Sequence, residues 1–224
     1  MLGLTLNLRR RRSPTFLFLG AHSDDIEIGC GGTVTELLRQ FPNSHVYWVV
    51  LSAGSEARVR EANRAAKAFL RKAKKSTVIV KDFRGAFFPS EHTQIKEFFE
   101  EIKRLVDPDV IFAHYRDDLH QDHRVVGELV WNTFRNHMIL EYEIPKYDGG
   151  IGSPSVFVPL SAAAMKKKVS TLMKVFGTQH GKQWFTPSTF EGLMRLRGIE
   201  CNAASGYAEA FYSRKIVFGG EGDS

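Results

Sequence analysis

Apolar residues gather in four short continuous runs within the first 134 residues, and a segment with helical spacing follows each run. TFLFLG at 15–20 and HVYWVVL at 45–51 are the clearest of these runs. Strands that are apolar throughout and joined by helices are typical of a parallel sheet covered on both faces. We therefore predict strands over residues 15–20, 45–51, 77–80 and 109–113, and helices over 31–41, 55–74, 90–106 and 124–134.

The pattern changes beyond residue 136, where the apolar runs are more widely spaced. Neither an internal repeat nor a linker separates this half from the first half. With right-handed crossovers, the chain is expected to form an α/β fold with a doubly wound, Rossmann-like, mostly parallel sheet. We predict one domain over 15–224, after a leader or edge segment over 1–14. The later elements are expected as strands over 139–144, 156–158 and 207–217, helices over 161–176 and 190–198, and loops over 149–152 and 201–206.

Size and cysteine content narrow the class of protein. The chain has 224 residues, 43% of them hydrophobic, which suits one compact domain. It contains no run of about 18 apolar residues, so no membrane span is expected. Cys30 and Cys201 are the only cysteines, which argues against a disulfide scaffold and favours a reducing compartment. We expect a cytoplasmic protein.

The chain is basic, with a net charge of +6 and a pI of about 9.3. The excess lies in separate runs at 9–12, 71–75 and 166–168, and a nucleic-acid binder would gather it on one face or arm. We therefore expect no nucleic-acid partner and interpret the last two runs as solvated faces of amphipathic helices. Attraction of an anionic substrate, such as a phosphorylated or nucleotide-linked sugar, is a second interpretation.

Two polar segments follow the first and fourth predicted strands. They are GAHSDDIEIGCGGT at 20–33 and HYRDDLHQDHR at 114–124. In an open α/β sheet, ligands bind beyond the carboxyl ends of the strands, and two such ends can lie side by side. Imidazole and carboxylate groups at both ends therefore predict a metal site. The groups concerned are His22, Asp24, Asp25, His120, Asp122 and His123.

Three of these residues satisfy the requirement of a catalytic zinc site. Such a site takes three protein ligands and keeps a fourth position for water. His22 and Asp25 lie on one turn, and His123 would come from the turn after the fourth strand. We predict that these three bind Zn²⁺, with another divalent metal as the alternative.

The remaining groups are suited to acid–base chemistry. Asp24, beside the ligand pair, is the natural base for a water molecule activated by the metal. His120 could stabilise the oxyanion or protonate the leaving amine as an imidazolium. Asp122 is suited to hold an imidazole in one tautomer.

The glycines after the first motif raise the alternative of dinucleotide binding. That fingerprint requires a third glycine where this chain has Val34, and an acidic residue near 51–53, which is LSA. We instead expect the glycines to let the helix N-terminus approach the strand and the metal loop closely. Cys30 could in principle be a soft ligand, but we interpret it as a small packed residue.

At these residues the chain resembles the PIG-L/LmbE-like zinc N-deacetylases. AHSDD at 21–25 with Gly29, Gly31 and Gly32 is similar to that family's A-H-P-D-D-x-x-x-G-x-G-G motif, and HQDH at 120–123 to its H-x-D-H motif. Weaker similarity lies in RVREANRAA at 58–66, DF at 82–83 and YAEAF at 207–211.

The resemblance implies hydrolysis of the acetamide of an N-acetylated amino sugar or sugar conjugate, giving acetate and a free amine. It implies the same zinc ligands and base as above, and Arg58 as a substrate contact. Two positions depart from the pattern. Ser23 replaces a proline, and Asp118 stands where some members have a tyrosine that could assist the oxyanion.

Aromatic and polar groups in two later segments are candidates for the substrate rim. YDGGIGSPS at 147–155 and QHGKQWF at 179–185 combine such groups with glycines, and sugar pockets are commonly built this way. We predict Tyr147, His180 and Trp184 as substrate contacts. The alternative for Trp184 is a place in the core or in the interface of a homo-oligomer.

The sequence thus predicts a zinc-dependent deacetylase acting on a small N-acetylated sugar. The rival interpretation is a metal-stabilised, nucleotide-sugar-binding protein without catalysis. Such a protein would not need Asp24 and His120 to face one cavity.

Overall fold

The computed structural model describes residues 3, 8, 13–148 and 150–217. Most of the predicted segment 1–14, including the basic run at 9–12, therefore lies outside the described residues, as does Gly149 of the predicted loop. Within the described residues, no helix is both long and apolar enough to cross a bilayer.

One sheet of seven strands forms the centre of the molecule, in the order β3-β2-β1-β4-β5-β7-β6. Strands β1 to β5 pair in parallel, and β7 pairs antiparallel with both β5 and β6. This confirms the predicted α/β fold with a mostly parallel sheet. The strands are β1 (Thr15–His22), β2 (His45–Ser52), β3 (Lys75–Val80), β4 (Val110–His114), β5 (Met138–Tyr142), β6 (Val156–Pro159) and β7 (Ala208–Tyr212).

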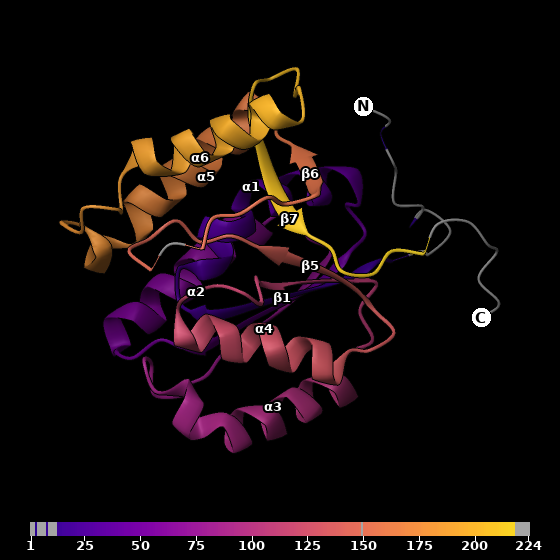
Figure 1. Ribbon diagram of the computed structural model, residues 1–224, viewed down its shortest axis with the longest axis vertical. Coiled ribbons are helices and arrows are strands. Elements are labelled where there is room, and N and C mark those ends of the chain that lie inside the picture. Colours follow the sequence, from indigo (N-terminus) through magenta and orange to yellow (C-terminus); the bar gives the residue numbers. More distant parts are fainter. Residues whose placement is uncertain (1–2, 4–7, 9–12, 149, 218–224) are drawn as a thin grey trace.

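Helices cover both faces of this sheet (Figure 1). Helices α3 and α4 lie on one face, and α1, α2, α5 and α6 contribute to the core on the other. The α-helices are α1 (Asp25–Gln40), α2 (Glu56–Leu70), α3 (His92–Leu105), α4 (Gln121–Thr133), α5 (Ala162–Val175) and α6 (Pro187–Glu200); two 3₁₀ helices are η2 (Phe88–Glu91) and η3 (Gly177–Gln179).

The two cores explain why the strands are apolar throughout. Successive side chains of a strand point to opposite faces of the sheet. In β1, Phe16 and Phe18 enter the core beneath α1 and α5, whereas Leu17 and Leu19 enter the core beneath α3 and α4. Because helices bury both faces of the sheet, the strand has apolar side chains at every position and not only at alternate ones.

Helix α1 begins six residues earlier than predicted, at Asp25 instead of Gly31. It is kinked at Cys30, whose backbone is non-helical with φ −145° and ψ 20°. The predicted close approach is confirmed for Gly29. A Cβ there would lie 2.2 Å from the ring of Tyr142 on β5, so only glycine fits. Sequence spacing alone does not reveal that the turn is absorbed into the helix.

The amides exposed by the kink are capped by a side chain from the far end of the chain. Glu209 on β7 accepts hydrogen bonds from the backbone N–H of Gly32 (2.9 Å) and of Thr33 (2.6 Å). The same carboxylate binds Lys168 of α5 at 2.6 Å, and both side chains are buried. The prediction that residues 166–168 form a solvated helix face is therefore wrong for Lys168.

Other boundaries differ for local reasons. Helix α2 ends at Leu70, since the chain must turn before Lys75 pairs with His45 on β2. Strand β7 ends at Tyr212, opposite Glu141, whereas the apolar pattern predicted continuation to residue 217. Helix α4 begins at Gln121, which places the second motif in its first turn.

Candidate metal centre and active site

The two predicted motifs meet at one edge of the sheet. Strands β1 and β4 are adjacent and parallel, and they end at His22 and His114. Helices α1 and α4 start just beyond these ends, so Asp25 and His123 lie in their first turns. The strand order reverses at this point, which is where open α/β sheets bind ligands.

Asp25 is the centre of the cluster. Its Oδ2 lies 3.2 Å from Nδ1 of His22, 3.5 Å from Nε2 of His123 and 3.1 Å from Nε2 of His114. His22, Asp25 and His123 each offer a ligand atom within 4.8 Å of the others. The structure thus brings together the three residues that the sequence predicts as metal ligands.

Carboxylates hold two of the imidazoles from behind. Oδ2 of Asp122 lies 3.0 Å from Nε2 of His22, and Oδ2 of Asp118 lies 3.0 Å from Nδ1 of His123. The opposite ring nitrogen of each histidine therefore faces Asp25. Metal-binding histidines typically have their second nitrogen held in this way. Asp122 was predicted to hold an imidazole in one tautomer, and the imidazole that it contacts is that of His22.

The donor set fits zinc. Two imidazole nitrogens and one carboxylate oxygen are ligands that Zn²⁺ accepts, with a position left for water. His22 is 18% exposed, whereas Asp25 and His123 are buried, so access is from the His22 side.

Two overlapping groups of residues could also hold an ion: His22 with His120 and Asp122, and His114 with Asp118 and His123. In both groups the carboxylate already contacts a histidine of the predicted ligand set, on the ring nitrogen that faces away from Asp25.

Charge within the metal-free cluster is divided between Asp25 and His22. Burial alone would lower the pKa of His22, but the carboxylates of Asp25 and Asp122 raise it to about 9. Burial and the neighbouring His123 lower the pKa of His114 to about 3. Near neutral pH His22 is therefore protonated and His114 is neutral. A bound cation would replace the proton of His22.

Asp24 is next to Asp25 in the chain, and its side chain makes no hydrogen bond to the three predicted ligands His22, Asp25 and His123. It is the residue before α1, and its side chain makes no capping bond to that helix. Its Oδ1 accepts a hydrogen bond of 2.9 Å from Nη2 of Arg58, and the carboxylate is buried. Arg58, predicted as a substrate contact, thus holds the predicted base and also lies 3.5 Å from the hydroxyl of Thr178.

His120 stands at the N-terminus of α4. Its Nδ1 accepts a hydrogen bond of 3.2 Å from the backbone N–H of Asp122, which leaves the proton on Nε2. Its ring centroid is 5.1 Å from that of His22 and 4.5 Å from that of His123. Burial and the charge of His123 lower its pKa to about 4. The neutral ring can donate a hydrogen bond from Nε2.

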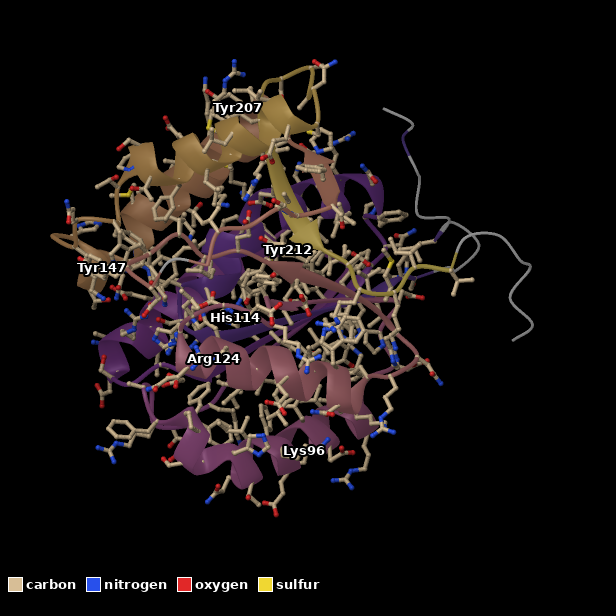
Figure 2. All side chains as sticks on the ribbon, in the orientation of Figure 1. Lys96, His114, Arg124, Tyr147, Tyr207 and Tyr212 are labelled. Carbon is tan, nitrogen blue, oxygen red and sulfur yellow. The ribbon has the colours of Figure 1, made fainter. Side chains whose placement is uncertain are left out.

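Three residues of the site were missed from the sequence. His114 lies inside the fold, at the centre of Figure 2, and its Nε2 is 2.9 Å from the backbone N–H of Ala21. Asp118 was considered only as the position where some family members have a tyrosine, and its contact with His123 was not predicted. Lys146, from the loop after β5, lies 3.2 Å from Nε2 of His123. The sequence offered one signal for these residues, which is that the apolar run at 110–113 ends in a histidine, His114.

The predicted substrate rim is less closely tied to the cluster. Tyr147 is 71% exposed and lies at the edge of the molecule (Figure 2). Nε2 of His180 lies 2.9 Å from the carbonyl oxygen of Met173. Trp184 packs edge-on against Phe185 at 5.4 Å and against the core, as the alternative interpretation proposed.

Cys30 is a packed residue, as expected. Its thiol is fully buried and donates to the carbonyl of Ile26 at 3.2 Å. Burial raises the pKa of the thiol well above its usual range. Among the described residues, it belongs to none of the groups that could hold an ion.

Solved structures share this fold. N,N'-diacetylchitobiose deacetylase from Pyrococcus horikoshii superposes with a TM-score of 0.69 at 18% identity, covering 94% of this chain and 87% of that chain. A zinc-inhibited form of teicoplanin deacetylase gives 0.69 at 13% identity, covering 89% and 97%. The 4-carboxy-2-hydroxymuconate hydratase GalB from Pseudomonas putida gives 0.72 at 15% identity, covering 93% and 99%. At these identities the likeness shows the fold alone.

A family model gives the more specific finding. The model described as PIG-L, GlcNAc-PI de-N-acetylase, matches residues 17–134, which is more than half of the chain. The matched region includes both motifs and every residue of the histidine–carboxylate cluster. Taken with the fold, this match shows that the chain belongs to the PIG-L family.

Proposed function

We propose that this protein is a zinc-dependent hydrolase that removes the acetyl group from an N-acetylated amino sugar or sugar conjugate. The observation that carries the proposal is the position of Asp24 beside a set of three ligands, His22, Asp25 and His123, without a hydrogen bond to any of them. A site that only held a structural ion would not need a further buried carboxylate, held by Arg58, at that place. The family and the deacetylases of similar fold support the same reaction.

The residues of the chain divide the work. His22, Asp25 and His123 would hold the zinc, and the chemistry it would supply is acidification of a water molecule and polarisation of the acetamide carbonyl. Asp24, oriented by Arg58, accepts the proton of the attacking water. It can then pass this proton to the departing amine as the C–N bond breaks.

His120 serves the acyl oxygen. Its neutral ring carries the proton on Nε2, because Nδ1 accepts from a backbone N–H. A donor held in this way can stabilise the negative charge that develops on the oxygen as water adds to the carbonyl carbon. The products are acetate and a free amine.

The fold does not decide the reaction, since the hydratase GalB has a similar fold. The rival without catalysis would bind a nucleotide sugar and keep the metal. Only a measurement of turnover distinguishes this rival from the proposed deacetylase.

Acetate release tests the proposal. Purified protein is stripped of metal, reconstituted with one equivalent of Zn²⁺, and assayed over a panel of N-acetylated sugars. The matched control is Asp24→Asn, which keeps the ligands and removes the base. We expect acetate from the parent protein with at least one sugar, and a loss of about 10²–10⁴-fold in the variant at unchanged zinc content. Equal turnover by the variant would remove Asp24 from the mechanism, and sugar binding without acetate release would favour the rival.

A further inference from the structure

A lysine from the loop after β5 points into the metal-binding corner. Nζ of Lys146 lies 3.2 Å from Nε2 of His123, the nitrogen that faces Asp25. Its charge also acts on His22 and on His120. Lys146 is partly exposed, so its ammonium group lies beside the ligand set and within reach of solvent.

The loop that carries Lys146 is fixed at its base. Glu143 is buried, and both its oxygens bind the guanidinium of Arg197 on α6, at 2.6 and 2.9 Å. The same guanidinium donates to the carbonyl of Gly152 at 2.9 Å, and the hydroxyl of Tyr212 lies 3.2 Å from Glu143. Two points before and after Lys146 are thus tied to one buried arginine, so the lysine is held at the site by the fold.

A second lysine approaches from the segment after α5. Nζ of Lys182 donates to Oε1 of Gln179 at 2.6 Å, and Gln179 is buried. Burial lowers the pKa of Lys182, and the charged groups that act on it are Asp24, Arg58 and Lys146. Nε2 of Gln179 donates to the hydroxyl of Thr178 at 3.2 Å, and that hydroxyl lies 3.5 Å from Nη1 of Arg58, which holds Asp24. These contacts connect Lys182 to the Asp24 side of the site, whereas Lys146 lies on the His123 side.

Neither lysine has an acidic partner within the described part of the chain. The carboxylates nearby are already committed. Asp24 binds Arg58, Asp118 binds His123, and Asp122 binds His22. Two ammonium groups thus lie beside the metal-binding residues, and neither forms an ion pair with a carboxylate among the described residues. Such a pair favours a ligand that brings its own negative charge.

We propose that Lys146 and Lys182 together bind an acidic group of the substrate, a carboxylate or a phosphate, so that the enzyme prefers acidic N-acetylated sugars over neutral ones. This inference rests on the deacetylase function proposed above. It adds the substrate class and two specificity-determining residues.

Matched substrates and variants test the pair. N-acetylglucosamine is compared with its 6-phosphate and with N-acetylmuramic acid, which carries a carboxylate. The variants are Lys146→Met and Lys182→Met, and the control is Lys103→Met, an exposed lysine of α3, a helix that carries none of the site residues. We expect kcat/KM for one acidic sugar to exceed that for the neutral sugar by at least about tenfold. Each variant should reduce this ratio by roughly 10–100-fold, chiefly through KM, as for a lost hydrogen bond to a charged group. The control should leave the ratio unchanged.

A binding measurement keeps the test independent of turnover. Calorimetry with glucosamine, glucosamine 6-phosphate and muramic acid reports affinity for the deacetylated sugars, and the phosphate and carboxylate arms separate the two anions. Acidic sugars should bind more tightly to the parent protein than to either lysine variant.

The failures are distinguishable. If no sugar is deacetylated but acidic sugars bind through the lysines, the proposed reaction is wrong and the anion site stands. If neutral and acidic sugars are turned over and bound equally, or if the variants weaken both alike, the anion site is overturned and the deacetylase stands. A fall in zinc content in Lys146→Met with no change of preference would likewise overturn it.

Discussion

Glu209 and Gly32 are 177 positions apart, yet the carboxylate of the first accepts a hydrogen bond of 2.9 Å from the backbone N–H of the second. In dinucleotide-binding folds, a glycine-rich helix start of this kind receives a pyrophosphate. Here a side chain of β7 supplies the negative charge, and Lys168 neutralises it. The glycine segment is therefore a structural joint between the two halves of the domain.

Glu209→Gln should be strongly destabilising. It removes the anion that faces two backbone amides and leaves the Lys168 ammonium buried without a partner, at a cost of about 3–5 kcal/mol in the free energy of unfolding. Urea unfolding of the parent and the variant measures this difference. The control is Glu128→Gln, an exposed glutamate of α4. The double variant with Lys168→Met should recover part of the loss, and equal stability of parent and Glu209→Gln would contradict the joint.

Asp118→Asn should weaken zinc binding without removing a ligand. Asp118 fixes the orientation of His123 through Nδ1, and loss of such a partner typically costs roughly 10–100-fold in metal affinity. Competition with a chelator of known affinity gives the dissociation constant. The neighbouring Asp117→Asn, at an exposed position, serves as the control. If both variants bind zinc equally well, Asp118 does not support the metal ligand.

Zinc affinity should depend on pH through His22. Because the carboxylates of Asp25 and Asp122 outweigh burial and raise its pKa to about 9, the metal must displace a proton below that pH. Affinity should then rise by about tenfold per pH unit between pH 7 and 9 and level off above. Calorimetry in two buffers of different ionisation enthalpy should count about one proton released per zinc at pH 7.5. An affinity independent of pH would show that His22 is neutral in the metal-free protein.

The raised pKa of His22 also makes the stability of the metal-free protein depend on pH, in the opposite direction to the zinc affinity. A raised histidine pKa means that the folded state binds the proton more tightly than the unfolded chain. Its contribution to stability is complete below pH 6.5 and is lost as the pH rises through about 9.

Glu27→Gln should stabilise the metal-free protein at alkaline pH. Glu27 is fully buried in α1, and neither carboxylate oxygen has a hydrogen-bond partner among the residues that the structure describes. Burial raises its pKa well above the usual 4.5, so the unfolded chain loses this proton at lower pH than the folded state does. The stability of the parent should therefore fall as the pH rises above 4.5, and the glutamine variant should lack that contribution. Urea unfolding at pH 5 and pH 8 should show an advantage of the variant that grows with pH. A constant difference would mean that Glu27 is ionised in the fold.

The sequence predicted those features that depend on local pattern. Strands such as 15–20 and 45–51 were visible because burial on both faces requires a continuous apolar run. The convergence of His22, Asp25 and His123 was predictable because His22 and Asp25 share one turn, and because parallel strands bring a second turn to the same edge.

Features that depend on distant partners escaped prediction. The helical state of 25–30 is hidden by Gly29, which is required there because Tyr142 fills the space that a side chain would occupy. Lys168 lies in a basic run, and only the fold places Glu209 opposite it. His114 resembles any histidine at a strand end until Asp25 is brought beside it.

The family match ends at residue 134, between the residues proposed for hydrolysis and the lysines proposed to bind the substrate. All residues that would hold zinc or move a proton lie within 17–134, whereas Lys146, Lys182 and the arginine that anchors their neighbourhood come after it. Exchanging the C-terminal ninety residues between relatives, with Arg197 and Glu143 moved as a pair, should therefore transfer substrate preference and leave the hydrolytic apparatus intact.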